Sequence, residues 1–243
     1  MESKSLVTPT RVHPPARRLR VGPPPAAAAR APSPRWQRRK EARPAELLSA
    51  ALEVFAERGY AATRLEDVAR RAGVTKGTMY LYFEGKEDLF KELVRRTALP
   101  AVEIAEELLR THRGSARDLV KKLLRKRWEV MVGGSLGAIA KLMMSEAGNF
   151  PKLARWYHEE IIARSNAVLA AAVARGIARR EFRDVDPRRT AYLAVAPLLM
   201  AAVWRHSFGH CTTLPFEPDS YLEQHLDVFL RGLERRPARS KKS

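Results

Sequence analysis

Residues 63–88 constrain the fold more than any other part of this 243-residue chain. Thr63 with Glu66 three residues later forms a capping-box pattern, which predicts the start of a helix. Gly73 follows where that helix should stop, because glycine reaches the left-handed conformation without steric cost. Thr75 is a second N-cap candidate, and a short helix should follow it. Two short helices joined by a tight turn are typical of a helix-turn-helix, whose second helix enters the DNA major groove.

The flanking sequence is also helical in pattern. An apolar stripe predicts a helix from about Arg43–Pro44 to Gly59, and another predicts a helix over about 86–99, ended by Pro100. No segment from 100 to 235 alternates as a strand would. The helices expected there are about 101–112, 116–131, 135–147, 151–179, 187–207 and 217–234. The predicted fold class is therefore all-α.

Composition and helical pattern divide the chain into four predicted regions. Residues 1–36 contain eight of the sixteen prolines and scattered Arg, so they are expected to form a disordered basic arm. Whether this arm is inert or touches DNA stays open. Residues 37–99 form the predicted DNA-binding domain, 100–235 a larger effector-binding and dimerisation domain, and 236–243 a basic tail.

The net charge of +18 belongs mainly to the ends of the chain. Residues 1–40 carry +9 and residues 231–243 carry +5, whereas residues 41–96 hold ten basic and ten acidic side chains. The total charge suggests a polyanionic partner. It does not by itself show that the helix-turn-helix region binds DNA.

The sequence gives less support to a disulfide-linked protein, a membrane protein, a metalloprotein or an enzyme. The single cysteine, Cys211, excludes an internal disulfide and fits a reducing compartment. The most apolar run, 191–204, is interrupted by Pro197, so no membrane segment is expected. His206, His210 and Cys211 are close in sequence, but Gly209 should interrupt the helix, so no metal site is predicted. No catalytic constellation or cofactor motif is found, and the chain is expected to be a cytoplasmic non-enzyme.

Residues 43–96 resemble the N-terminal DNA-binding domain of TetR/AcrR-family transcriptional regulators. The matching text is ELLSAALEVFAERGY followed by TRLEDVARRAGVTKGTMYLYFEGKEDLF. The resemblance implies a three-helix DNA-binding unit, a linking fourth helix and a C-terminal helical domain. It also implies a homodimer that binds a double-stranded operator and, as a repressor, is released from it by an unknown small-molecule effector.

Eight residues are the candidates for contact with DNA. The threonine hydroxyls and tyrosine phenols suit phosphates. The lysine at the start of the recognition helix is the longest donor and could reach a guanine edge, and glycine lets the backbone approach the DNA closely. A lysine at the start of the next helix could hold a phosphate together with that helix's N–H groups. These candidates are Thr63, Thr75, Lys76, Gly77, Thr78, Tyr80, Tyr82 and Lys86.

The C-terminal region contains two further sets of candidate residues, one for an effector pocket and one for a dimer interface. Aromatic residues and methionines line apolar cavities well, so the candidate effector pocket comprises Trp128, Met131, Met143, Met144, Phe150, Trp156, Tyr157 and His158. Two helical stretches are more apolar than a one-sided surface helix should be, and in the family the last two long helices pair with those of a second copy. The candidate dimer residues are Val168, Ala171, Val173, Leu198, Leu199, Ala202 and Trp204.

One function from a different class competes with the regulator. The basic tails could coat nucleic acid without sequence preference, as in an architectural protein. Competition between specific and random DNA at rising salt separates the two functions.

Overall fold

The computed structural model describes residues 34–209, 211 and 217–235, with side chains from residue 44 onward. Over these residues the all-α prediction is confirmed, since the only β-pairing is an isolated bridge between Phe182 and Glu234. The expected arm and tail fall largely outside the described residues. The chain divides into two units, Met1–Arg39 and Lys40–Ser243, and the site lies in the second.

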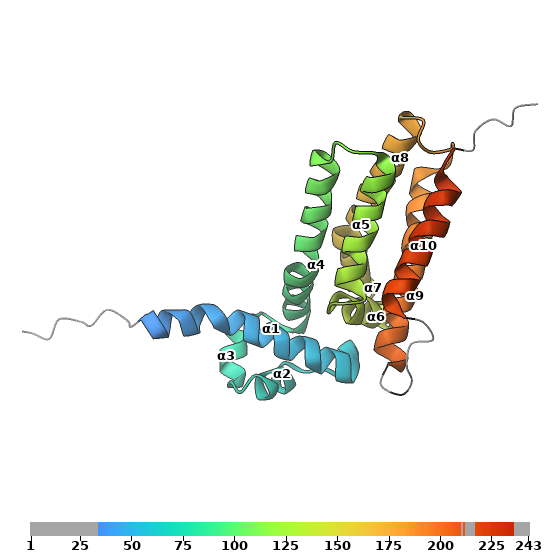
Figure 1. The fold of residues 1–243 in the computed structure, drawn as a ribbon. Coiled ribbons are helices and arrows are strands. Elements are labelled where there is room, and N and C mark those ends of the chain that lie inside the picture. Colours follow the sequence, from blue (N-terminus) through green and yellow to red (C-terminus); the bar gives the residue numbers. More distant parts are fainter. Residues whose placement is uncertain (1–33, 210, 212–216, 236–243) are drawn as a thin grey trace, which may run out of the picture. The chain divides into compact units, whose positions relative to one another are not determined.

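Three helices form the N-terminal headpiece: α1 (Pro34–Ala62), α2 (Leu65–Arg71) and α3 (Lys76–Tyr80) (Figure 1). Helix α1 begins earlier than the expected start at Arg43, and Pro44 lies inside it. The residues before Pro44 are mostly Arg, Lys, Glu, Gln and Ala, which favour helix. Gly59 interrupts the helical backbone of α1 with φ 78°, at the place where the sequence predicted the helix to end.

An aromatic cluster forms the headpiece core. The ring of Phe55 meets that of Phe90 edge-on at 5.4 Å between centroids, and Tyr60 meets Phe90 at the same distance. Edge-to-face pairs add stabilisation beyond the area that they bury. Because Phe90 belongs to α4 (Lys86–Thr111), this cluster attaches the headpiece to the helix that continues into the C-terminal region.

Helix α4 (Lys86–Thr111) passes through Pro100, so the predicted helix end at Pro100 is wrong. A proline inside a helix removes one backbone hydrogen bond and crowds the preceding turn. Here the apolar side chains of Ala98 and Val102, on either side of the proline, are buried. Packing of α4 against α5 (Ala116–Met131) and α8 (Arg164–Ala178) stabilises the helix across this position.

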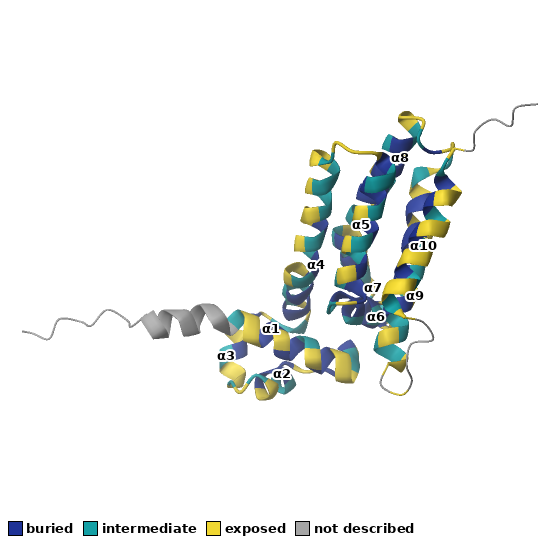
Figure 2. Ribbon diagram, viewed as in Figure 1, coloured by how far each residue is buried: buried dark blue, intermediate teal, exposed yellow. Residues whose placement is uncertain are grey.

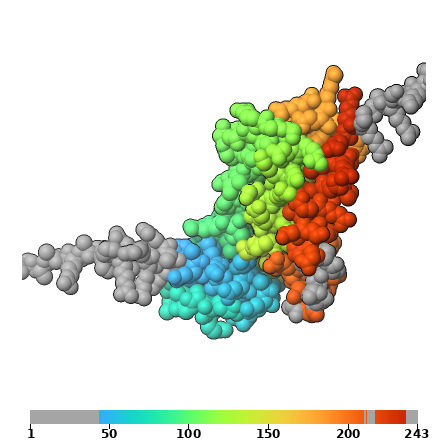
Figure 3. Space-filling model, viewed as in Figure 1, coloured from blue at the N-terminus to red at the C-terminus, as the bar shows by residue number. Residues whose placement is uncertain are grey.

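The outer boundaries of the remaining predicted helices agree with the structure to within about two residues, but the helix predicted over 151–179 contains a π-helical segment that the sequence did not indicate. The elements are α5 (Ala116–Met131), α6 (Leu136–Glu146), α7 (Pro151–Tyr157), the π-helix η1 (His158–Ala163), α8 (Arg164–Ala178), α9 (Pro187–Phe208) and α10 (Pro218–Leu233). Their buried faces turn toward one another (Figure 2). Helix α10 packs on α5 and α9 and forms part of the surface (red in Figure 3).

One continuous stretch, Pro151–Ala178, is long and apolar enough to cross a membrane by length and composition alone. In this structure the same stretch packs against α4, α5 and α9. It contains buried side chains such as Leu169 and Val173. Its place among the other helices buries 39% of its most apolar window, so packing accounts for part of its apolar character.

Candidate DNA-binding surface and ligand cavity

The second helix of the helix-turn-helix is built by local chemistry. Gly73 has φ 65°, the left-handed conformation that ends α2. The Thr75 hydroxyl accepts a hydrogen bond from the Thr78 N–H at 3.2 Å, which caps α3. The hydroxyls of Thr75 and Thr78 are also 3.0 Å apart. The two threonines thus face the same side at the start of α3.

Three more candidates lie on the exposed side of this short helix. Tyr80 is 50% exposed, and Lys76 extends from the first turn with its ammonium 2.5 Å from the Glu66 carboxylate. This contact raises the pKa of Lys76, so the lysine is charged. Gly77 is exposed, and a Cβ placed there would meet nothing closer than Thr75 at 3.8 Å. Nothing in the fold therefore requires glycine at this position.

Thr63 does not cap α2 as the sequence predicted. Its side chain is 1% exposed, and its hydroxyl donates to the Gly59 carbonyl at 2.6 Å. The cap is one residue later, where the Asp67 carboxylate accepts from the Arg64 N–H at 3.3 Å. Because Thr63 is buried and already bonded, it is not placed to contact a phosphate. Glu66, its expected partner, pairs with the lysine of α3 instead.

Lys86 is also used inside the protein. Its ammonium donates to the carbonyls of Tyr60 at 2.7 Å and Ala61 at 2.9 Å, and it lies 4.6 Å from the centre of the Tyr60 ring. Partial burial lowers its pKa. A lysine has three N–H donors, so one remains for an outside partner. Tyr82, the last candidate, is half-buried beside Phe83.

Sequence reasoning missed Arg64. It is exposed at the N-cap of α2, directly after the buried Thr63. It extends into solvent from the end of the helix where the sequence had placed a phosphate contact. If the predicted N-cap of α2 had been placed one residue later, Arg64 would have been identified as a candidate.

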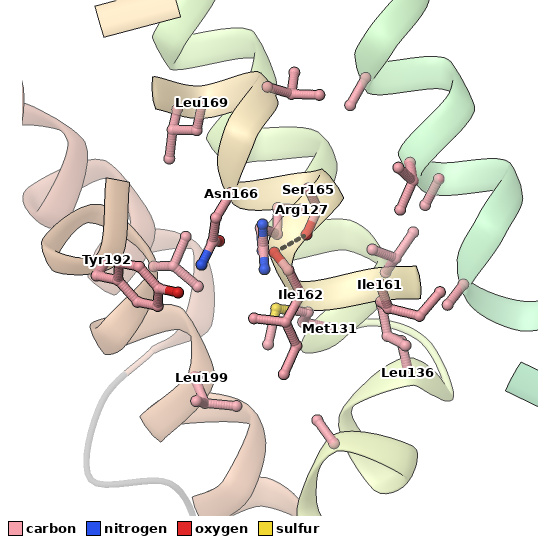
Figure 4. Close-up of a pocket in the computed structure, with 18 of the residues that line it drawn as sticks. Arg127, Met131, Leu136, Ile161, Ile162, Ser165, Asn166, Leu169, Tyr192 and Leu199 are labelled. Carbon is pink, nitrogen blue, oxygen red and sulfur yellow. Dashed lines mark hydrogen bonds between the residues drawn. The ribbon is translucent and has the colours of Figure 1, made fainter. Parts of the chain in front are cut away.

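The C-terminal helices enclose a cavity of about 1020 Å³. Side chains from α4, α5, α6, α8 and α9 line it, together with the π-helix η1. Aliphatic residues such as Leu136, Ile161, Leu169 and Leu199 surround most of the space (Figure 4). A π-helical turn beside a cavity is a common feature of functional sites. The volume is at the upper end of the range for small-molecule pockets.

Five of the eight predicted pocket residues line this cavity: Met131, Met143, Met144, Tyr157 and His158. Trp128 instead stacks on Tyr221 of α10. Phe150 packs edge-on against Tyr60 at 4.7 Å, and Trp156 lies against Lys91 and Arg95 of α4. These three were misplaced because helical spacing does not determine which neighbour a large ring will contact.

The cavity also contains polar groups that the sequence did not indicate. Arg127 of α5 and Asn166 of α8 both line it, and both are directed into the space between the helices (Figure 4). Burial lowers the pKa of Arg127 to about 10, so its guanidinium is charged at neutral pH. In the sequence Arg127 is one of several cations on an amphipathic helix, and nothing distinguished it from the solvated ones.

The headpiece and the cavity are joined by the end of α6. The Glu146 carboxylate is buried and accepts hydrogen bonds at 3.1 Å from the Ala61 N–H of α1 and from the Asn149 side chain. These bonds hold the pKa of Glu146 below its usual range. Met143 and Met144, on the same helix, line the cavity. One helix therefore contacts both regions.

Most of the candidate dimer residues lie in the core of the chain itself. Val168, Val173, Leu198 and Ala202 are at most 5% exposed, because α8 and α9 pack on each other, and they cannot form a surface. Ala171 is exposed, whereas Leu199 and Trp204 are half-buried. The larger exposed apolar side chains are others: on α9 they are Tyr192, Leu193, Met200 and Phe208, and on α10 Val228.

No metal site is found among the residues that the structure describes, judged by clusters of three or more His, Cys, Asp or Glu. Gly209 follows α9 as its C-cap. His210 lies outside the described residues, so the spacing of His206, His210 and Cys211 is not defined.

Two family models match the chain. The model for bacterial regulatory proteins of the tetR family matches residues 47–93. The model for the tetracyclin repressor-like C-terminal domain matches residues 110–209. The first match covers the helix-turn-helix, and the second covers most of the helices around the cavity.

Individual proteins agree with these matches. The fatty acid metabolism regulator protein of Bacillus subtilis is 29% identical over 103 residues, covering 42% of this chain and 53% of the relative. The repressor BepR of Brucella suis is 42% identical over 71 residues, or 28% of this chain and 34% of the relative. The chain thus spans about half, or less, of the length of these curated relatives.

Solved structures extend the similarity over most of the chain. NalD, the secondary repressor of a multidrug efflux pump in Pseudomonas aeruginosa, has a TM-score of 0.65 at 26% identity, covering 80% of this chain and 98% of NalD. FadR from Bacillus subtilis in complex with stearoyl-CoA also has a TM-score of 0.65, at 21% identity, covering 78% and 99%. The FadR similarity concerns the fold alone.

Proposed function

Because this chain belongs to the TetR family of bacterial regulatory proteins, we propose that it is a transcriptional repressor that binds operator DNA as a dimer and is released by a small molecule. The observation that carries this proposal is a single unit containing both an exposed, capped helix-turn-helix and an apolar cavity. A regulator of this kind acts on DNA in the cytoplasm and is not an enzyme.

Operator recognition is assigned to the exposed side of α3. Lys76 is the longest donor there, and its present partner, Glu66, is itself 40% exposed. An exposed ion pair contributes little stability, so the lysine can exchange Glu66 for a base or a phosphate at small cost. Thr78 and Tyr80 place a hydroxyl and a phenol on the same short helix.

Release by the ligand is assigned to α6. Met143 and Met144 would contact a ligand in the cavity, and Glu146, further along that helix, is bonded to the end of α1. A ligand that displaces α6 would therefore change the position of the headpiece, which couples the two sites. The aliphatic lining favours an apolar effector. The name of the Bacillus subtilis relative, a regulator of fatty acid metabolism, agrees with this preference.

Dimerisation is assigned to the exposed apolar side chains of α9 and α10. Leu193 is 69% exposed, Met200 60% and Val228 67%, which is unusual for residues of this size unless a partner covers them. A second copy of the chain would bury them in an isologous contact. Two headpieces would then read a pseudo-palindromic operator.

The experiment begins by selecting bound sequences from random DNA. With the selected operator, Lys76→Ala should weaken binding by about 1–3 kcal/mol, or roughly five- to a hundredfold, because a base or phosphate contact is lost. Lys122→Ala is the matched control, since Lys122 also makes an exposed ion pair, with Asp118 of α5, but lies outside the headpiece. It should bind like the wild type.

Equal binding by the wild type and both variants would refute the role of α3. The competing function, coating of nucleic acid by the basic tails, makes a different prediction. In that case random DNA would compete as well as the operator at every salt concentration. The nearly neutral charge of residues 41–96 argues for sequence-specific contacts instead.

A further inference from the structure

The charge inside the cavity is one-sided. Three cationic side chains, Lys126, Arg127 and Arg189, are among its lining residues, and no aspartate or glutamate is found in that lining. Lys126 pairs with Glu129 at 2.8 Å, and Arg189 pairs with Asp186 at 3.6 Å. Both of these pairs lie partly in solvent.

Arg127 differs from the other two cations. Arg127 is half-buried, and within the described part of the chain its guanidinium makes no hydrogen bond or ion pair, although it carries five N–H donors. Apart from Lys126, which pairs with Glu129, the other residues of α5 that line the cavity are apolar: Leu123, Leu124, Val130 and Met131. A charged group that is partly shielded from water and has no partner is costly, so proteins rarely retain one beside apolar walls that serve only packing.

Two polar side chains accompany Arg127. Asn166 is 6% exposed, its Oδ1 atom is buried without a partner, and no hydrogen bond joins its amide to the rest of the described chain. Tyr157 also lines the cavity, and burial raises its pKa to about 12 despite the nearby Arg127, so its phenol keeps its proton. An arginine, an amide and a phenol together supply several donors and a positive charge, and no anion.

We propose that Arg127, with Asn166 and Tyr157, binds the single carboxylate of an elongated aliphatic acid, whose hydrocarbon body fills the rest of the cavity. This proposal rests on the proposed function, in which the cavity is the effector site. The guanidinium matches a carboxylate in a two-bond geometry, and the pairing neutralises the buried charge. The aliphatic walls contributed by Leu169, Leu199 and Ile162 then cover the chain of the ligand (Figure 4).

The test measures direct binding of four probes to the full chain in the absence of DNA. The probes are hexadecanoic acid, its methyl ester, hexadecanol and hexadecylamine, which share a chain and differ in the head group. The wild type should bind the acid about tenfold to a hundredfold more tightly than the ester or the alcohol, and should bind the cationic amine most weakly. An acid that binds no better than the alcohol would overturn the proposal.

Arg127→Met keeps a long side chain and removes the charge. It should lower the affinity for hexadecanoic acid by about tenfold to a hundredfold and leave the affinity for hexadecanol unchanged. Arg127→Lys should fall between, because an ammonium lacks the planar fork. Arg189→Met is the matched control, since Arg189 lines the cavity but is already paired, and it should bind the acid like the wild type.

Thermal unfolding separates a ligand contact from a structural role. Without ligand, Arg127→Met should be about as stable as the wild type, because the half-buried guanidinium has no hydrogen bond or ion pair to lose. Hexadecanoic acid should raise the Tm of the wild type and not that of the variant. A large loss of stability in the ligand-free variant would assign Arg127 to structure and refute the proposal.

The failure of this proposal can be distinguished from the failure of the proposed function. If all four probes bind equally and Arg127→Met changes nothing, the cavity is still an apolar effector site and only the carboxylate assignment is wrong. If no probe binds while the selected operator is still bound, the cavity does not take an aliphatic effector, and both assignments of the cavity fail.

Discussion

The exposed side of α3 and the cavity of the C-terminal helices differ in the exposure and the pairing of their positively charged side chains. Lys76 on α3 is exposed and paired with Glu66, whereas Arg127 is enclosed and has no partner among the described residues. An exposed pair contributes about 0–1 kcal/mol and exchanges partners easily. A half-buried cation without a partner carries a desolvation cost that a bound anion would offset. We therefore expect DNA recognition to depend on where side chains are placed, and ligand recognition in the cavity to depend on charge.

The largest expected effects come from core substitutions, which test whether the headpiece and the C-terminal helices can lose stability and binding separately. Phe55→Ala in the headpiece and Leu198→Ala in α9 both remove fully buried side chains, and they should lower the free energy of unfolding by about 3–5 and 2–5 kcal/mol. Phe55→Ala should abolish operator binding and leave ligand binding intact. Chemical denaturation with both binding assays checks this. Loss of both activities in each variant would mean that the regions unfold as one.

A smaller effect concerns Glu146, which joins the regions. Glu146→Ala leaves the Ala61 N–H without its acceptor and should cost about 1–3 kcal/mol at neutral pH. The lowered pKa of Glu146 stabilises the fold above the unfolded-state pKa, and this contribution is lost as the pH falls through the folded-state pKa. The wild type and the variant should therefore converge in stability as the pH falls from the unfolded-state pKa of about 4.3 through the lower folded-state pKa.

Denaturation over a pH series provides the measurement for Glu146. Glu106→Ala is the control, because Glu106 makes an exposed pair with Arg164 and should cost at most about 1 kcal/mol. If Glu146→Ala stays equally far below the wild type at every pH, its carboxylate charge is not what stabilises the contact. The same variant should also weaken the effect of a ligand on operator binding.

The smallest expected effects compare two helix caps. Thr75 caps α3 and Ser115 caps α5 in the same way, because each side-chain oxygen accepts a hydrogen bond from the N–H three residues later. Replacing either with alanine should cost about 0.5–2 kcal/mol. Only Thr75→Ala should weaken operator binding, as measured by titration of labelled DNA. Equal operator affinity in the two variants would show that the threonine is only a cap.

The parts that sequence predicted well depend on interactions between near neighbours. The turn at Gly73 and the cap at Thr75 involve residues within a few positions of one another, and both are found as expected. The boundaries of α5 to α10 follow from Gly, Pro and Asp at helix ends in the same way. The cap of α2 was displaced by one residue because Thr63 donates back to Gly59 instead.

The sequence alone determined an all-helical chain with a helix-turn-helix near its N-terminal end, because caps, turns and apolar periodicity act locally. Only the tertiary structure decided which apolar faces are buried within the chain, as for Leu198 and Ala202, and that α4 continues past Pro100. It also decided that, of the many cations, Arg127 is enclosed without a partner. The physical reason is that burial and pairing depend on neighbours far away in sequence, which a local pattern does not specify.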